Sequence, residues 1–405
     1  MELGPVKPRE RLVTLDILRG FALLGVLLGN LAHLYSGFWA DGHSPRGAAD
    51  TFTRYFITIV VQSKAQTLLT FLFGFGFASQ LLRAEARHEP IMGLYARRIA
   101  ALLAFGIAHV TLLWWGDVLW TYAVTAPFLL LFLRVSNRTR VIVAVILILI
   151  PSAIFAVHGV WEHVFALLFD PRHDYAAPVL RAIHGRSHTT VMVEQARYAV
   201  VFTAAFWPQY FAWLVGNFLL GYVVGQLRWF EHDGADHLSA FRRMFWVGLV
   251  LGGTATALTV FGLRGGWNHY DISTIGMAAL GLIDPLDYAG LALMFTASVV
   301  LLAQRPAWAR ILAVVAPVGR MPLTTYLTQS LVCTFIIYGW GLGAIEWLEE
   351  IDYLVLGIAI FIGQIFVSHL WLRYFRFGPL EWLWRWVVYL RRPPFVVARD
   401  REARP

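Results

Sequence analysis

The sequence predicts an all-α, polytopic membrane protein with about ten transmembrane helices and both termini in the cytoplasm. Apolar residues make up 58% of the 405 residues, and the mean hydropathy is +0.62. Several uncharged runs approach the roughly 20 residues that a helix needs to cross a bilayer. Lysine and arginine are about three times as frequent in alternate connecting segments as in the others. Since basic segments stay cytoplasmic, this alternation favours an even number of spans.

The predicted spans follow the apolar runs in order. The first resembles a secretory signal, but it is too long and lacks a clear small-residue cleavage site, so it is predicted to remain as a span. The ten predicted spans are 15–36, 58–82, 99–115, 118–134, 141–157, 209–227, 244–263, 286–303, 321–340 and 354–374.

One apolar run, from Ala101 to Leu133, is too long for a single span. As one helix it would measure about 50 Å, against a hydrocarbon core of about 30 Å. Arginines flank both of its ends, so the run is predicted to cross outward and return. The turn falls at Trp115-Gly116-Asp117, which places Asp117 at the outer face and His109 two helical turns below it. Ionisable groups at membrane depth are costly and therefore mark functional candidates.

The connections between spans are mostly short, which favours one helical domain over residues 1–390. A long outer loop is predicted at about 158–208 and a second outer segment at 264–285, either of which could hold re-entrant or interfacial helices. The tryptophan-rich segment 381–386 is typical of a helix lying on a membrane surface. The basic tail 391–405 is predicted to be disordered.

Several functions are excluded or disfavoured by composition. The single cysteine, Cys333, excludes an intramolecular disulfide, a cysteine-based zinc site and covalent c-type haem. Neither lysine fits a Walker A motif, and Gly74-Phe75-Gly76 indicates small-residue helix packing. The histidines of the long outer loop lack a third ligand at zinc spacing, so no metal site is predicted. The net charge of +8 reflects cytoplasmic arginines and gives no evidence for nucleic acid.

Polar residues of the first two spans give the first site candidates. Asp16 and Arg19 share one helix face at the inner end, either as an anchoring ion pair or as a site for an anionic cytosolic group. Asn30 lies about 21 Å farther along the same helix. Its side chain either joins two helices by hydrogen bonds or forms part of a site. Lys64 lies in the second span, where a lysine needs a partner of opposite charge. Asp117 is the nearest outer carboxylate in this topology, so a Lys64–Asp117 pair is predicted.

His109 and Asp117 would suit proton transfer, because a neighbouring carboxylate fixes the imidazole tautomer and raises its basicity. A structural hydrogen bond from His109 to a backbone carbonyl is the alternative. On the ninth span, Arg320 opens a polar helix that also carries Gln329. The polar side chains of this helix either form hydrogen bonds with neighbouring helices or line a hydrated groove. In the second case, Arg320 at the inner end of the groove would bind phosphate.

The chain resembles the YeiB-like family of bacterial inner-membrane proteins, which contains the domain of unknown function 418. The resemblance covers nearly the whole chain in order and omits the long outer loop. The motifs that carry it are Thr14–Asn30, Leu72–Phe77, Tyr95–Arg98, His109 with Trp115–Leu119 and Tyr122, Gly319–Ser330, Tyr338–Gly343 and Phe377–Trp384.

The first span is also similar to that of the transmembrane acyltransferase superfamily. There, an asparagine at the place of Asn30 and a histidine about a dozen residues later belong to the active site. That later position corresponds to His43, because His33 lies too close to Asn30 to align. The related architecture implies that acyl-CoA enters from the cytosol and the acceptor from the far side.

The leading hypothesis is therefore a bacterial inner-membrane acyltransferase without a tightly bound cofactor. Arg19, Arg97, Arg98 and Arg320 would gather the phosphates of acyl-CoA. His109 or His43 would act as general base on a small-molecule, lipid or glycan acceptor, oriented by Asp117 and Asn30. The alternatives are a proton-coupled transporter that uses the same polar groups and a non-catalytic membrane scaffold. The absence of visible internal repeats favours the enzyme over the transporter.

Overall fold

The computed structural model confirms an all-α polytopic membrane protein. It describes residues 11–37, 45–88, 90, 92–157, 160, 166, 169–170, 173–265, 277–279 and 281–397. Within these residues, eight helices are long and apolar enough to cross a membrane. A ninth crossing is the pair Pro306–Arg320 and Pro322–Ile337, which is bent by 79°, and Leu119–Phe132 is a shorter apolar helix. Each of the ten predicted spans thus coincides with a helix.

The described residues of the first half are mostly helical. The helices are α1 (Val13–Asn30), η2 (Leu31–Tyr35), α3 (Ala48–Phe56), η3 (Ile57–Val61), α4 (Lys64–Ala86), α5 (Met92–Leu112), α6 (Leu119–Thr125), η4 (Ala126–Phe132), α7 (Asn137–Ala156) and α9 (Ala176–His184).

The second half contains the longest helix, α10, and ends in the short α18. Its helices are α10 (His188–Gln226), η5 (Glu231–His237), α11 (Leu238–Gly265), α13 (Ile283–Ala303), α14 (Pro306–Leu312), η7 (Ala313–Val315), α15 (Ala316–Arg320), α16 (Pro322–Ile337), η8 (Ala344–Glu346), α17 (Glu350–Tyr374) and α18 (Pro379–Tyr389).

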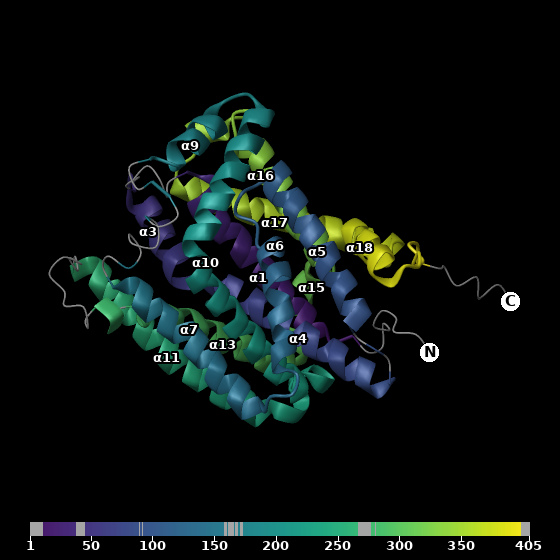
Figure 1. Ribbon diagram of the computed structural model, residues 1–405. Helices are drawn as coiled ribbons and strands as arrows, with labels where there is room; N and C mark the ends of the chain where they lie inside the picture. The colour runs from purple at the N-terminus through teal and green to yellow at the C-terminus, as the bar shows by residue number, and fades with distance from the viewer. Residues whose placement is uncertain are drawn as a thin grey trace.

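Helix α1 forms the centre of the bundle and packs against α4, α13, α15 and α17 (Figure 1). At the end where α1 begins, a Cβ on Gly319 would lie 1.9 Å from the carbonyl oxygen of Asp16. Helix α18 packs there against α5 and α16. We call this the terminal end, and the opposite end, which carries α3 and α9, the distal end. Because the described chain begins and finishes at the same end, it crosses the bundle an even number of times.

Close approach of backbones fixes the central crossings. A Cβ on Gly74 of α4 would lie 2.0 Å from the carbonyl oxygen of Phe218, and one on Gly221 of α10 would lie 1.9 Å from that of Phe71. The two glycines therefore face each other's helices. The glycine motif near Gly74 serves helix packing, as the sequence indicates.

Two boundaries differ from the sequence prediction. The sixth span, predicted to begin at 209, belongs to a longer helix: within the predicted outer segment, α10 already begins at His188 and continues through Pro208 as one 39-residue helix. Ser187 caps its start by accepting a hydrogen bond from the Thr190 amide, so the signal for the start of the helix lies well before the proline. A proline removes one helix hydrogen bond and can be carried by a packed helix.

The predicted disorder of the C-terminal tail is wrong for residues 391–397. The Arg376 amide donates to the Phe395 carbonyl and the Val397 amide donates to that of Tyr374. The Phe395 ring packs on Trp382 at a centroid separation of 5.1 Å. This segment therefore folds back on α17 and α18, because its aromatic and aliphatic residues find a partner surface. Residues 398–405 lie outside the described part of the chain.

Glu381 of α18 caps the start of α16. Its carboxylate accepts the backbone amides of Leu323 and Thr324 at 2.6 and 2.9 Å and the Thr324 hydroxyl at 2.6 Å. Burial raises the pKa of this carboxyl above its ordinary value, and the hydrogen bonds from Thr324 and Leu323 oppose that rise. The cap joins α18 to the bent ninth span.

Substitution Glu381→Ala is expected to destabilise the protein by about 1–3 kcal/mol, because three donors of α16 lose their acceptor in a buried place. Thermal unfolding of the purified protein in detergent measures this loss. Glu231→Ala is the matched control, since that carboxylate is exposed and pairs with the exposed Arg228. An equal effect of the two substitutions would contradict the capping role.

Candidate functional site

The predicted hairpin is present, and His109 and Asp117 hold it together. Helix α5 ends at Leu112 and α6 begins at Leu119. His109 Nδ1 lies 2.6 Å from Asp117 Oδ2, and Asp117 Oδ1 accepts the Trp120 amide at 2.9 Å. This confirms the predicted pair. Both side chains have 0% exposure, and Asp117 also belongs to the residues that line the neighbouring pocket.

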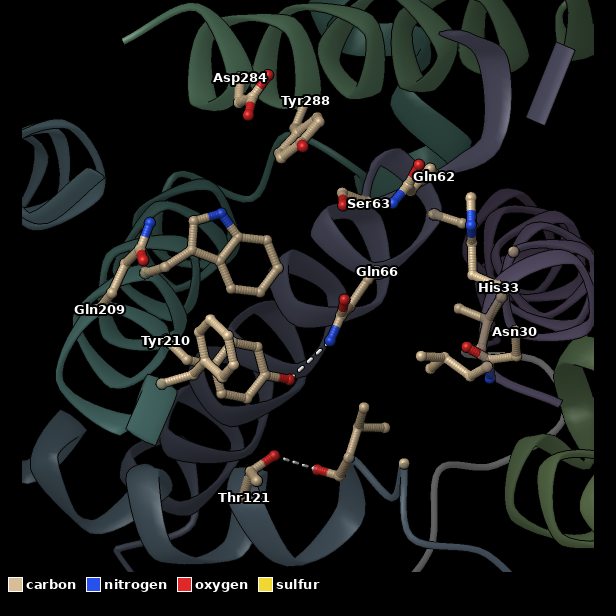
Figure 2. A pocket seen from close by; sticks show the side chains of 18 of the residues that line it. Asn30, His33, Gln62, Ser63, Gln66, Thr121, Gln209, Tyr210, Asp284 and Tyr288 are labelled. Carbon is tan, nitrogen blue, oxygen red and sulfur yellow. Dashed lines mark hydrogen bonds between the residues drawn. The ribbon is translucent and has the colours of Figure 1, made fainter. Parts of the chain in front are cut away.

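A pocket of about 560 Å³ lies beside this hairpin, in the distal half of the bundle. Its walls come from α1, the start of α4, the 115–122 turn, the end of α7, the middle of α10 and the start of α13. Many of the side chains around the open space are polar, and Figure 2 labels some of them. The labelled residues are Asn30, His33, Gln62, Ser63, Gln66, Thr121, Gln209, Tyr210, Asp284 and Tyr288. Trp115, Phe202, Phe206, Trp207 and Trp213 supply aromatic surface.

Asn30 and His33 reach the pocket from the last turn of α1 and from η2. Both line the cavity, on the right side of Figure 2. The His33 Nε2 atom is buried and finds no hydrogen-bond partner among the described residues. The predicted candidate Asn30 thus lines the pocket. It is accompanied by His33, which does not align with the histidine of the acyltransferase superfamily. His43 lies outside the described residues.

A break between η3 and α4 builds the centre of the pocket wall. Gln62 is extended with ψ 130°, and Ser63 is left-handed with φ 63°. This conformation is rare for a residue with a Cβ. It brings Gln62, Ser63 and Gln66 to the cavity, where the Gln66 amide donates to the Tyr210 hydroxyl at 2.6 Å. Strained backbone of this kind concentrates at functional sites.

Lys64 pairs with Asp287 of α13, and the predicted Lys64–Asp117 pair is wrong. Lys64 Nζ lies 2.6 Å from Asp287 Oδ2 and donates to the Thr58 carbonyl at 2.8 Å. The break at residues 62–63 directs Lys64 toward α13, whereas Asp117 is already bound by His109. One turn before Asp287, Asp284 lines the pocket.

The predicted phosphate-binding arginines lie at the terminal end, and three of them are engaged by the protein. Arg19 pairs with Asp16 at 3.1 Å, which confirms that predicted pair, and Arg11 also contacts Asp16. Arg97 donates to the Val388 carbonyl at 2.7 Å, and the Arg98 guanidinium lies 4.6 Å from the Trp384 ring. These contacts hold α5 against α18.

Arg320 differs from those three, and it has a companion that the sequence prediction missed. The Nε atoms of Arg320 and Arg385 are both buried without a hydrogen-bond partner in the described part of the chain. Both guanidinium groups interact electrostatically with Arg11. The terminal end therefore holds a group of arginines with unused donors. In contrast, Gln329 donates to Gln364 at 2.9 Å and joins α16 to α17.

No group of three histidine, cysteine, aspartate or glutamate side chains is placed to hold a metal ion within the described residues.

The chain is similar to known proteins over nearly its whole length. The model of the domain of unknown function 418, a protein of unknown function, matches residues 224–391. Uncharacterized protein YxaH of Bacillus subtilis (strain 168) is 32% identical over 97% of this chain and 98% of its own length. The chain belongs to the YeiB-like family. Uncharacterized protein YeiB of Escherichia coli (strain K12) is 28% identical over 97% of this chain and its own full length.

A third relative has the same extent, an uncharacterized 39.9 kDa protein from the amylase 3′ region of Bacillus acidopullulyticus. It is 29% identical over 99% of this chain and 100% of its own length. No solved structure matches this YeiB-like protein.

Several pocket residues escaped the sequence prediction. Asp284 and Asp287 are three residues apart at the start of a span, a pattern that could have indicated a shared helix face. Gln62, Ser63 and Lys64 interrupt an apolar run with polar residues, which could have indicated a break. Tyr210 and Trp207 carry no such signal, because aromatic residues are common in any membrane helix.

Proposed function

We propose that this YeiB-like protein is an acyltransferase of the bacterial inner membrane. It would take an acyl group from acyl-CoA at the terminal end and transfer it to an acceptor in the pocket. The observation that carries the proposal is the unpartnered Nε2 of His33, which lines the same pocket as Asn30. A positioned imidazole and a neighbouring amide are the two groups that acyl transfer needs.

In this reaction, His33 acts as the general base. Its Nε2 removes the proton of an acceptor hydroxyl or amine, whose oxygen or nitrogen then attacks the thioester carbon. The Asn30 amide donates to the developing oxyanion. The carbon–sulfur bond breaks and coenzyme A leaves as thiol after taking up a proton. His109 and Asp117 position the hairpin wall, since their side chains are fully buried.

The donor's phosphates fit the terminal end. Arg320 and Arg385 have unused donors beside Arg11, and arginine binds phosphate well. The pocket lining on α1 stops at Gly25, six residues from Arg19, or about 9 Å along the helix. A flexible thioester arm has only this short distance to cross. Basic residues gather at this end, so we assign it to the cytoplasmic side.

The acceptor side suits a polyhydroxylated or amphiphilic molecule. Amide, hydroxyl and indole groups alternate around the cavity, and they offer both hydrogen bonds and flat apolar surfaces. The charge of Lys64 is matched by Asp287. The pocket therefore favours a neutral or amine-bearing small molecule, lipid head group or glycan over an anion.

A proton-coupled transporter is the second candidate, and the Lys64–Asp287 pair favours it. Buried ion pairs next to a cavity at membrane depth are typical of proton-linked transport. In that case proteoliposomes would accumulate substrate in response to a pH gradient, and Asp287→Asn would remove the gradient dependence. The enzyme hypothesis requires no such dependence.

Substitution His33→Ala is expected to slow release of coenzyme A from acetyl-CoA by about 100-fold or more, because general-base catalysis is lost. The assay uses purified protein in nanodiscs, with water or added polyols as acceptors. Acetyl-CoA binding should remain, while Arg320→Ala and Arg385→Ala should each weaken it. The control His369→Ala alters a histidine outside the pocket that contacts the Val314 carbonyl. Wild-type protein that neither binds nor cleaves acetyl-CoA would rule out this function.

A further inference from the structure

One wall of the distal pocket carries a carboxylate that the protein leaves without a partner. Asp284, in the first turn of α13, lines the pocket and is exposed. Within the described part of the chain, no hydrogen bond or ion pair reaches its carboxylate. Its electrostatic neighbours are Asp287 and Lys64. The Asp284 carboxylate is therefore available to a molecule in the pocket.

The nearby lysine does not balance the charge of Asp284. Lys64 Nζ lies 2.6 Å from Asp287 Oδ2, and both side chains are buried. The ammonium group is therefore held by Asp287. With two carboxylates and one ammonium group, the α13 wall keeps one negative charge.

The rest of the described pocket lining contains no cation that could neutralise this charge. It includes neither lysine nor arginine, and its other carboxylate, Asp117, contacts His109. His33 belongs to η2 on another wall, and Figure 2 shows it apart from Asp284. An uncompensated carboxylate at membrane depth is costly. A positive charge on the bound molecule would reduce that cost.

The surroundings of Asp284 suit an ammonium group better than a metal ion. Tyr288 lies one helical turn after Asp284, and both line the pocket (Figure 2). The Tyr288 ring already has a cation beside it, since Lys64 Nζ lies 5.1 Å from its centroid. Divalent cations prefer several oxygen ligands, and no three acidic, histidine or cysteine side chains converge among the residues that the structure describes.

We propose that Asp284 binds the protonated amine of the molecule that occupies the pocket. The remaining walls offer amide and hydroxyl groups, so the occupant also carries hydroxyl groups, as an amino alcohol or an amino sugar does. The inference rests on the proposed function only in making this molecule the acyl acceptor. In that role a hydroxyl of the molecule is acylated, because an ammonium group has no free electron pair with which to attack a thioester.

Three probes that differ only in their end group test the charge preference. They are the cation tyramine, its neutral alcohol analogue tyrosol and the anion 4-hydroxyphenylacetate. Saturation-transfer NMR titration at neutral pH gives the Kd of each probe for the protein in nanodiscs of zwitterionic lipid, with empty nanodiscs as the blank. Tyramine should bind about tenfold more tightly than tyrosol, and the anion most weakly, because a charged hydrogen bond forms only with tyramine. Equal affinities, or no binding of tyramine, would overturn the proposal.

Two substitutions of Asp284 locate the preference. Asp284→Asn should weaken tyramine binding to the level of tyrosol, whose own Kd should stay unchanged and thereby report a folded pocket. Asp284→Lys should reverse the order, so that 4-hydroxyphenylacetate binds most tightly. Asp236→Asn is the matched control, since that carboxylate is exposed and pairs with His232. The proposal fails if Asp284→Asn keeps the wild-type order, or if neither Asp284 variant binds tyrosol.

The amine site and acyl transfer can fail separately. Tyramine binding that depends on Asp284, in a protein that does not cleave acetyl-CoA, would keep the amine site and remove the acyltransferase. Cleavage of acetyl-CoA by a protein that binds the three probes equally would keep the enzyme and remove the amine site.

Discussion

Gly74→Val is expected to abolish accumulation of the folded protein. The new Cβ would lie 2.0 Å from the backbone carbonyl oxygen of Phe218, and a backbone atom cannot move aside as a side chain can. Helices α4 and α10 would have to separate at their main crossing, at a cost of more than about 4 kcal/mol. Size-exclusion chromatography of the detergent-solubilised protein measures the result as loss of the monodisperse peak.

Gly76→Ala is the matched control in the same motif. A Cβ at Gly76 meets no atom within 4 Å, and alanine favours a helix over glycine by about 1 kcal/mol. This variant should therefore be as stable as the wild type or slightly more so. Gly221→Val, on the facing helix, should behave as Gly74→Val does, because its Cβ would lie 1.9 Å from the Phe71 carbonyl oxygen. Normal yield of either valine variant would contradict the proposed crossing.

Lys64→Met is expected to destabilise the protein by about 3–5 kcal/mol, because it leaves a buried carboxylate without its cation. Asp287 is only 4% exposed, and its remaining polar partner is the Thr256 hydroxyl at 2.6 Å. Thermal unfolding in detergent, at matched lipid content, measures this loss.

Rescue identifies the partner of Lys64. Adding Asp287→Asn to Lys64→Met removes the stranded charge and should recover part of the lost stability. Adding Asp117→Asn should recover nothing, since that carboxylate contacts His109 and not Lys64. The opposite pattern would restore the pairing predicted from sequence.

The fold was predictable because the transmembrane spans depend on hydropathy and charge patterns that can be read directly from the order of the residues. Each span follows an apolar run, and the arginines flanking residues 101–133 require the hairpin that α5 and α6 form. The His109–Asp117 contact was predictable for the same reason, since one turn brings the two together.

The partner of Lys64 was not predictable in this way. It depends on how α4 is rotated relative to α13, and that rotation follows from the left-handed Ser63. The hydropathy pattern of the sequence does not predict this rotation. The position of His33 at the pocket likewise depends on tertiary packing. The contacts of Arg97 and Arg98 with α18 join residues that are almost 300 positions apart in the sequence, so local patterns could not predict them.

Helix α10 has a mechanical consequence. At 39 residues it is about 58 Å long, far more than the bilayer core. The helix packs on α9 and on α4 and α7. It therefore connects the distal surface with the body of the bundle. Pro208 removes one backbone hydrogen bond within the stretch that lines the pocket, so bending is easiest there. A load on the distal surface would change the shape of the pocket before it disturbed the rest of the fold.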